Sequence, residues 1–371
     1  MKRHRGFSLA ELLVAIAITS IVLAATLGAF ADAVRVNDFA TLLGDMDQNL
    51  RAGVNMMVRD LSQTGTGIPT GGLPCPSGAG ALRINRPSPP PGALTFPQDP
   101  VSLSTNLFAI NPGDGLGPVV QNAAASDIVS VLYIDNTLPL NQSFLTAIAP
   151  DGSSMTVDAG TPVAAGLNTD LQPGDLIMFS GPSGGNAIQE ITRVTGTQTV
   201  FFQANSGFFN LNQRNVPAGT IMCLANPGTN VTSDCSANNG GFPTAAGSTV
   251  ITASRVWMVS YYLDDVTNPQ MPRLVRVLNS GTTAFHTARP VALVLENLQL
   301  SYDIVDGVTN PANLPTIPTA LFPATSPNQA RKVNLFLAGR STTVNPRTRQ
   351  FLRNSLSTQI SLRSLSFVSR Y

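Results

Sequence analysis

The sequence predicts an α+β protein in which one long amino-terminal helix packs on an antiparallel, β-rich body. Three observations favour this fold class. The residues from Leu12 to Phe30 carry no charge, and apolar residues at helical spacing follow them. After Ser126, short runs of β-branched and aromatic residues alternate with turn formers. The 31 glycines and 28 prolines predict long irregular loops between these elements.

Composition limits the kinds of function that the chain can have. Only 12% of the 371 residues are charged, and 22 basic against 21 acidic side chains give a net charge of +1. This balance creates no overall field that would attract a polyanion. The hydrophobic share of 43% excludes a largely disordered chain. We expect no metal site and no cofactor, because three cysteines and two histidines lack the paired spacing of a structural zinc site.

Two of the cysteines are candidates for a disulfide. Cys223 and Cys235 bracket residues 226–230, a run of Asn, Pro, Gly and Thr that suits a small loop. In an oxidising compartment such a bond would stabilise the fold by roughly 3 kcal/mol. The alternative is that both are free buried thiols. With the disulfide formed, Cys75 remains unpaired.

The uncharged run is long enough to cross a membrane. Residues 12–30 as a helix cover about 28 Å, close to the ~30 Å thickness of the hydrocarbon layer. Three basic residues precede the run, and the first charge after it is Asp32. The positive-inside rule then places the amino terminus in the cytoplasm. We expect a single-pass inner-membrane protein with its body in the periplasm.

Two simpler interpretations of this start are an ordinary signal peptide and a plain membrane anchor. Residues 29–31 read Ala-Phe-Ala, which resembles a signal-peptidase cleavage site. Glu11 argues against both interpretations, because a carboxylate in an apolar helix costs about 2.5–3.5 kcal/mol on insertion scales and is rarely kept without a partner. The run is also longer than the 7–15 apolar residues of a typical signal peptide.

The start resembles the type IV prepilin family. Its signature is a short basic leader that ends in Gly, then Phe, Ser or Thr, Leu, any residue and Glu, and then about twenty apolar residues. Gly6, Phe7, Ser8, Leu9 and Glu11 match every position. The resemblance implies that a prepilin peptidase cleaves between Gly6 and Phe7 and methylates the new amino terminus at Phe7. It also implies that Glu11 pairs with the amino terminus of a neighbouring subunit during filament assembly.

The helix is expected to continue beyond the membrane to about Gln63. Apolar residues recur there at steps of three or four: Val36, Phe39, Leu43, Met46, Leu50, Val54, Met57 and Leu61. This outer half should pack on the body, and Gly65, Gly67 and Pro69 should end the helix. Gly28, Gly44 and Gly53 are either bending points or sites of close helix packing.

The rest of the chain divides by composition. Eleven of the prolines lie from Pro69 to Pro118, which predicts an irregular segment wrapped on the body, with a disordered linker as the alternative. We therefore divide the chain into a removed leader (1–6), the helix (7–64, transmembrane over 12–30), a Pro/Gly-rich segment (65–126) and a β-rich domain (127–371). Strand patterns in that domain cover 128–134, 176–179, 187–194, 199–203, 220–224, 250–263, 273–278, 298–304, 333–337 and 360–362. We expect them to form one antiparallel sheet against the helix.

The carboxyl-terminal half adds a looser resemblance. Residues 256–263, 272–277, 294–302, 337–341 and 357–363 are similar in layout to the large minor pilins of the PilW type and to type II secretion pseudopilins of the J class. The resemblance implies a minor pilin that takes part in assembling or priming a type IV pilus. Its implied partners are the prepilin peptidase, the inner membrane before assembly and other pilins or pseudopilins through the amino-terminal helix. After assembly the protein would lie in the pilus or at the cell surface.

Two motifs raise other chemistry, and we expect neither to make the protein an enzyme. Residues 181–185 satisfy G-x-S-x-G, but a nucleophile elbow leads from a strand into a helix, and the residues that follow alternate like a strand. We interpret them as a hairpin loop. Asp264, Asp265 and Asn268 could ligate calcium, but their spacing is not that of an EF-hand, and a turn-rich loop explains them.

A basic run near the end of the chain raises a third function, a pilus-tip adhesin or DNA-binding module. It has no acidic residue and comprises Arg331, Lys332, Arg340, Arg347, Arg349, Arg353, Arg363 and Arg370. Contact with a polyanion would fall on Arg347, Arg349 and Arg353. We favour a solvated sheet face, because aromatic residues for base stacking are sparse and acidic residues on the preceding strands offset the charge. DNA and a surface ligand therefore remain possible but less favoured partners.

Overall fold

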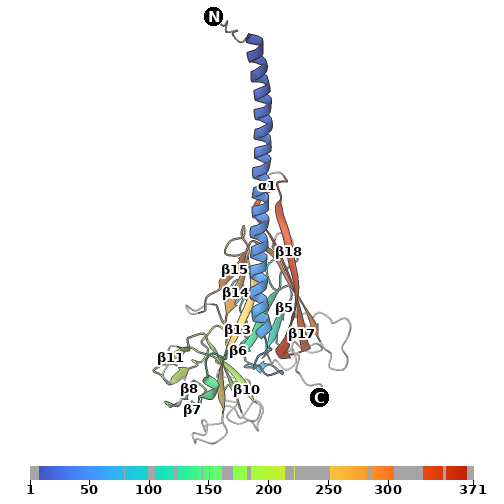
Figure 1. Ribbon diagram of the computed structural model, residues 1–371. Coiled ribbons are helices and arrows are strands. Elements are labelled where there is room, and N and C mark those ends of the chain that lie inside the picture. Colours follow the sequence, from blue (N-terminus) through green and yellow to red (C-terminus); the bar gives the residue numbers. More distant parts are fainter. Residues whose placement is uncertain are drawn as a thin grey trace.

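The computed structural model shows an α+β protein with one long helix and an antiparallel β-rich body (Figure 1). The structure describes residues 8–78, 80–98, 105–120, 124–143, 145–149, 151–160, 170–181, 185–213, 221, 251–281, 286–304, 329–345 and 348–365. Helix α1 spans Leu9–Gln63, so the predicted end at Gln63 is confirmed. Its first turn begins at Ser8, and its carboxyl-terminal half is embedded in the body.

The largest sheet has seven strands and is built around one central strand. β13 (Thr252–Asp264) pairs with β14 (Arg273–Leu278), β9 (Leu176–Ser180) and β6 (Ile128–Ile134), each time antiparallel. Three outer strands complete the sheet: β10 (Asn186–Glu190), β15 (Arg289–Leu293) and β5 (Ile110–Gly113). The predicted hairpin of β13 and β14 is confirmed, with Asp264 opposite Arg273 at its turn.

A second sheet contains the last three strands. β17 (Ala330–Val344) lies between β16 (Leu295–Ile304) and β18 (Phe351–Ser361). Inward and outward residues alternate along β16, as the sequence predicted. The prediction of a single sheet was therefore wrong. Alternation identifies which face of a strand is buried, but it does not identify the strand's partner.

The remaining strands are short. β7 (Leu145–Ile148), β8 (Ser154–Val157), β12 (Thr199–Phe201) and β11 (Arg193–Thr195) form a four-stranded sheet with its own apolar cluster. The predicted strand 187–194 is divided between β10 and β11, because the chain turns between sheets at residues 191–192. Residues 220–224 lie outside the described residues except Ile221, which is not in a strand.

The segment before β5 holds four two-residue strands in two small ladders: β1 (Leu73–Pro74) with β4 (Asn106–Leu107), and β2 (Asn85–Arg86) with β3 (Leu94–Thr95). Short 3-10 turns lie at η1 (Leu140–Gln142) and η4 (Arg363–Leu365). In the segment before β5, the prolines have no backbone N–H to donate to a strand ladder, so longer strand pairing does not develop there.

Helix α1 lies between the two larger sheets. It contacts β17 and β18 on one side and β15 and β6 on the other. The main core forms where these surfaces meet, and it includes Leu50 and Met57 of the helix with Leu274 and Leu337 of the sheets. The fold therefore attaches a rigid helix to the body along its carboxyl-terminal half only.

Candidate functional site: the amino-terminal helix and its attachment

The helix begins with a reciprocal cap between Ser8 and Glu11. The Glu11 backbone N–H donates to Ser8 Oγ at 3.2 Å, and Glu11 Oε2 accepts from the Ser8 backbone N–H at 3.0 Å. The Ser8 hydroxyl lies 3.0 Å from the same carboxylate oxygen. This capping box satisfies helix N–H groups that would otherwise lack partners. In the isolated chain, the carboxylate of Glu11 is thus held by its own helix start.

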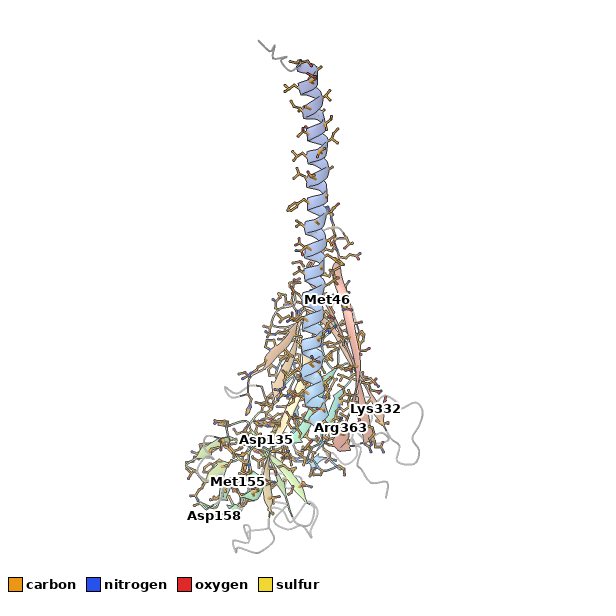
Figure 2. The ribbon with its side chains drawn as sticks, viewed as in Figure 1. Met46, Asp135, Met155, Asp158, Lys332 and Arg363 are labelled. Carbon is orange, nitrogen blue, oxygen red and sulfur yellow. The ribbon has the colours of Figure 1, made fainter. Side chains whose placement is uncertain are left out.

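The first half of α1 presents apolar side chains on every side. Leu9, Ile21, Leu27 and Phe30 are all at least 60% exposed, and Figure 2 shows these upper turns without any part of the body against them. Among the described residues, α1 is the one helix whose length and composition would allow it to cross a membrane. Thr19, Ser20 and Thr26 donate their hydroxyls to carbonyls one turn back, so their polarity is satisfied inside the helix. Such a surface needs an apolar environment or other helices to cover it.

The face that packs on the body begins at Met46, which Figure 2 labels at the point where α1 meets the sheets. The predicted stripe begins at Val36, nearly three turns earlier, and this part of the prediction was wrong. Val36, Phe39 and Leu43 are 68%, 39% and 37% exposed. Their spacing indicates an apolar helix face, but spacing does not reveal where the body ends.

Gly53 allows the helix to approach both sheets closely. A Cβ atom built there would lie 3.1 Å from Leu337 Cδ2, 3.2 Å from Leu274 Cδ2 and 3.3 Å from the Ala292 Cβ. At Gly44 the same construction meets nothing within 4 Å. Of the two interpretations offered for the helix glycines, close packing therefore applies to Gly53.

A buried carboxylate joins the last turns of α1 to the seven-stranded sheet. Asp60 Oδ2 accepts a hydrogen bond from the Tyr261 hydroxyl at 2.5 Å and from Arg276 Nε at 2.6 Å. Burial raises the pKa of Tyr261, and the Asp60 charge adds to that rise. Burial also raises the pKa of nearby Tyr133 to about 12. The sequence pattern does not reveal this contact, although Asp60 is adjacent to Leu61 of the predicted packing stripe.

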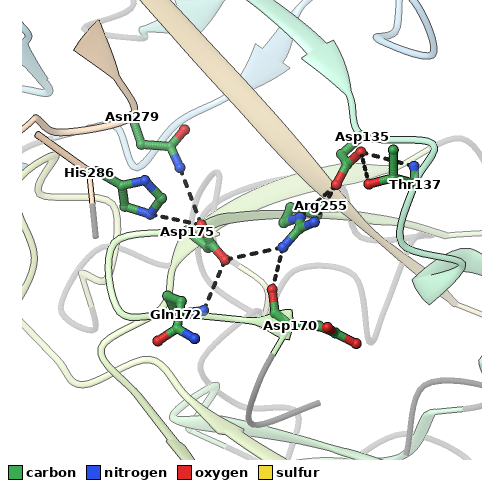
Figure 3. Close-up of polar contacts among 8 residues, drawn as sticks. All are labelled: Asp135, Thr137, Asp170, Gln172, Asp175, Arg255, Asn279 and His286. Atoms are coloured by element: carbon green, nitrogen blue, oxygen red, sulfur yellow. Dashed lines mark hydrogen bonds and ion pairs between the residues drawn. The ribbon is translucent and has the colours of Figure 1, made fainter. Parts of the chain in front are cut away.

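A second polar network fixes the junction between the two larger apolar clusters (Figure 3). Arg255 of β13 donates from Nε to Asp135 at 2.8 Å, and its guanidinium lies 3.7 Å from Asp175. Asp175 is also 2.8 Å from His286 Nε2. Burial alone would raise the pKa of Asp135, but hydrogen bonds from Thr137 and Arg255 hold it below its ordinary value. His286 and Asp175 are both buried, so this pair joins the segment before β9 to the segment before β15.

The cleavage and disulfide residues cannot be placed in this structure. Gly6, Phe7, Cys223 and Cys235 all lie outside the described residues. Cys75 is described, and it is a buried free thiol. Burial raises the pKa of that thiol, which makes it a poor nucleophile.

The described members of the basic run do not form one patch. Lys332 and Arg363 lie toward one end of the three-stranded sheet, as Figure 2 shows, and Arg340 and Arg353 face each other farther along it. Glu296 accepts from Arg353 Nε at 2.7 Å and lies 3.6 Å from Arg340 Nε. Glu296 therefore offsets part of this charge. Two of the acidic residues on the preceding strands have other contacts, since Asp264 pairs with Arg273 and Asp303 accepts from Asn334 and Gln359. Arg347 and Arg370 lie outside the described residues.

The other two motifs occupy hairpin loops. Gly181 and Gly185 close the loop between β9 and β10 with a backbone hydrogen bond of 2.8 Å, so the chain leads from strand to strand. This confirms the hairpin interpretation, although the serine itself lies outside the described residues. Asp264 accepts from the backbone of Val266 and Thr267 and pairs with Arg273 at 2.9 Å. A turn and an ion pair therefore account for that carboxylate.

Comparison with known proteins identifies one segment. A family model described as the prokaryotic N-terminal methylation motif matches residues 1–27. No curated protein and no solved structure gives a significant match. The match covers the basic start, Glu11 and most of the uncharged run, and it supports a protein of the type IV prepilin-like class, as found in pili and pseudopili.

Proposed function

We propose that this protein is a minor pilin that takes part in assembling or priming a type IV pilus. Its leader, residues 1–6, is removed by a prepilin peptidase, and the mature chain begins at an N-methylated Phe7. The mature helix stays in the inner membrane until other pilin helices cover it. The body serves as a structural module and carries out no reaction.

The observation that carries this proposal is the start of α1: a carboxylate followed by an uncovered apolar helix, inside the matched methylation motif. A membrane anchor alone requires only the apolar residues. Glu11 adds a charge that is costly in a bilayer, and cleavage before Phe7 would create the amine that could pair with it. The Ser8–Glu11 cap is local, so an incoming amine from a neighbouring subunit could take over the carboxylate without unwinding the helix.

Processing is tested by mass spectrometry of the chain purified from membranes. We expect the mature protein to begin at N-methylated Phe7 and Gly6→Leu to accumulate as the uncut precursor. Gly28→Leu is the matched control, because a side chain there meets nothing within 4 Å and should leave cleavage intact. A mature terminus at Asp32 would show an ordinary secreted protein instead.

Assembly is tested with Glu11→Gln, which keeps the side-chain shape and removes the charge. We expect normal cleavage, normal membrane insertion and little incorporation into filaments sheared from cells. Asp32→Asn, which removes an exposed charge after the apolar run, should assemble normally. Wild-type incorporation of the Glu11→Gln chain would contradict the proposed role of Glu11.

A pseudopilin of a type II secretion system is the second candidate, because the matched motif occurs in both classes of filament. The two functions differ in what is lost when the chain is deleted. Loss of surface pili with normal protein secretion supports the pilin, and loss of secretion with normal pili supports the pseudopilin.

A further inference from the structure

We propose that the end of the β17–β18 hairpin contacts phospholipid headgroups where α1 leaves the membrane. We define this hairpin end as Val344, Asn345 and residues 348–351. The inference rests on the proposed function in one respect, since it requires α1 to span a bilayer before assembly.

Close contacts fix the direction in which the hairpin runs. Gly53 of α1 lies against Leu337 of β17, with 3.1 Å from a built Cβ to Leu337 Cδ2. Two residues later on β17, a Cβ built on Gly339 would lie 3.4 Å from Leu50 Cδ2. The strand therefore advances toward the amino terminus of the helix. Figure 1 shows β18 extending along α1 farther in that direction than the other labelled strands.

The position along the helix follows from the rise per residue. Asn354 of β18 is opposite Gly339, and the four steps from Asn354 to Gln350, which pairs with Asn345 through a backbone hydrogen bond, cover about 13 Å. The same length on a helix is about 9 residues, which brings the hairpin end from the level of Leu50 to that of Thr41. Thr41 lies about 16 Å beyond Phe30, the last residue of the uncharged run.

That height places the hairpin end just outside the headgroup layer. The layer extends about 5–8 Å beyond the hydrocarbon on each side of a bilayer. The remaining distance of about 8 to 11 Å is comparable with the Debye length of about 8 Å at physiological salt, and a long arginine side chain shortens it further. A cation at the hairpin end therefore interacts with lipid phosphates.

The charge of the hairpin suits an anionic surface. From residue 307 to the carboxyl terminus the chain has no acidic residue. Arg340 and Arg353 both lie near the carboxylate of Glu296 at the base of the hairpin end. Arg349 is exposed, and no carboxylate among the described residues pairs with it. Val344, 45% exposed, adds an apolar side chain of the kind that interfacial segments carry.

The backbone presents Arg349 in a defined conformation. Its φ of 54° is left-handed, and its N–H donates to the Asn345 carbonyl at 2.8 Å. The Asn345 N–H in turn donates to the Gln350 carbonyl at 2.9 Å. A formed turn loses little conformational freedom on binding. With α1 as the first attachment, this second contact would fix the orientation of the body on the membrane.

The test uses the full chain in liposomes of phosphatidylglycerol and phosphatidylcholine. The photoreactive residue p-benzoylphenylalanine replaces Thr348 at the hairpin end or, as control, exposed Ser361 at the opposite end of β18. We expect lipid adducts at position 348 and a background level at 361. Arg349→Asn, which tolerates the left-handed backbone, should lower the adduct yield about fivefold, as expected for one basic side chain at an anionic surface. Arg363→Gln, at the far end, should leave it unchanged.

Separate outcomes distinguish failure of this inference from failure of the proposed function. Carbonate extraction reports whether α1 is inserted. A chain that resists extraction but gives equal adducts at 348 and 361 overturns the hairpin contact alone. Adducts to a second copy of the chain instead of lipid also overturn it, and they would identify a contact between subunits. Release of the chain by carbonate overturns the membrane-spanning helix and the proposed function with it.

Discussion

At the scale of single residues, Asp60 decides how firmly the helix is held. Its carboxylate is buried and bridges Tyr261 and Arg276 across the join between α1 and the large sheet. Buried charges depend on their partners, because removing one leaves the other desolvated and unpaired. The exposed pair of Asp47 and Arg51, on the same helix, lacks this dependence.

We predict that Asp60→Asn lowers the free energy of unfolding by about 2–4 kcal/mol. Asp47→Asn should lower it by less than about 1 kcal/mol, because both side chains of that pair reach solvent. Guanidinium unfolding followed by circular dichroism measures both changes. A chain that begins at residue 36 is long enough for this unfolding measurement, because the described helix residues buried in the core begin at Met46. Equal losses for the two variants would show that the Asp60 contact adds little.

The two charged contacts differ in how far sequence alone could predict them. Glu11 and Ser8 are three residues apart, so a local pattern contains the whole cap. Asp60 and Arg276 are 216 residues apart, and no local spacing connects them. The one local sign of the Asp60 contact is that this carboxylate lies on the helix next to the apolar stripe that is buried. Such a residue is rarely buried without a partner, but the sequence does not identify the partner.

At the scale of elements, α1 was predicted well because its signals are local. The apolar run, the helical spacing and the glycines after Gln63 all act within a few turns. The sheets were predicted less well. β13 and β16 both show strand patterns, yet they belong to different sheets, because pairing depends on contacts distant in the sequence. The same reason explains why residues 187–194 were not divided between β10 and β11.

Gly53 determines how closely α1 packs against the two larger sheets. Its missing side chain lets α1 approach Leu337 and Leu274, so we expect Gly53→Leu to destabilise the body by about 1–3 kcal/mol through overpacking. Gly44→Leu is the matched control, since its surroundings are open and leucine favours a helix over glycine by up to about 1 kcal/mol. Thermal unfolding of both variants should therefore shift in opposite directions. A rise in melting temperature for Gly53→Leu would show that the sheets can move apart without cost.

At the scale of the whole molecule, the net charge and the distribution of the cations indicate whether the body is structural or binds nucleic acid. With the leader removed as proposed, the loss of Lys2, Arg3 and Arg5 from the 22 basic side chains would leave 19 against 21 acidic ones. The described cations of the basic run are spread along the three-stranded sheet, and Glu296 lies near two of them. A scattered and partly neutralised set of cations releases few counterions from DNA.

We predict weak DNA binding by the body lacking residues 1–35, with a log-log salt slope shallower than about −2. Each neutralised phosphate contributes close to one unit to that slope, so contact through Arg349 and one further basic side chain would not exceed it. Fluorescence anisotropy over a salt series measures the slope. Two variants are compared: one replaces Arg347, Arg349 and Arg353 by Gln, and the other replaces Lys332 and Arg363, at the other end of the sheet. The first variant should change the salt slope by no more than the second does. A slope of about −4 or steeper that only the first set abolishes would make the body a DNA receptor carried on a pilin helix.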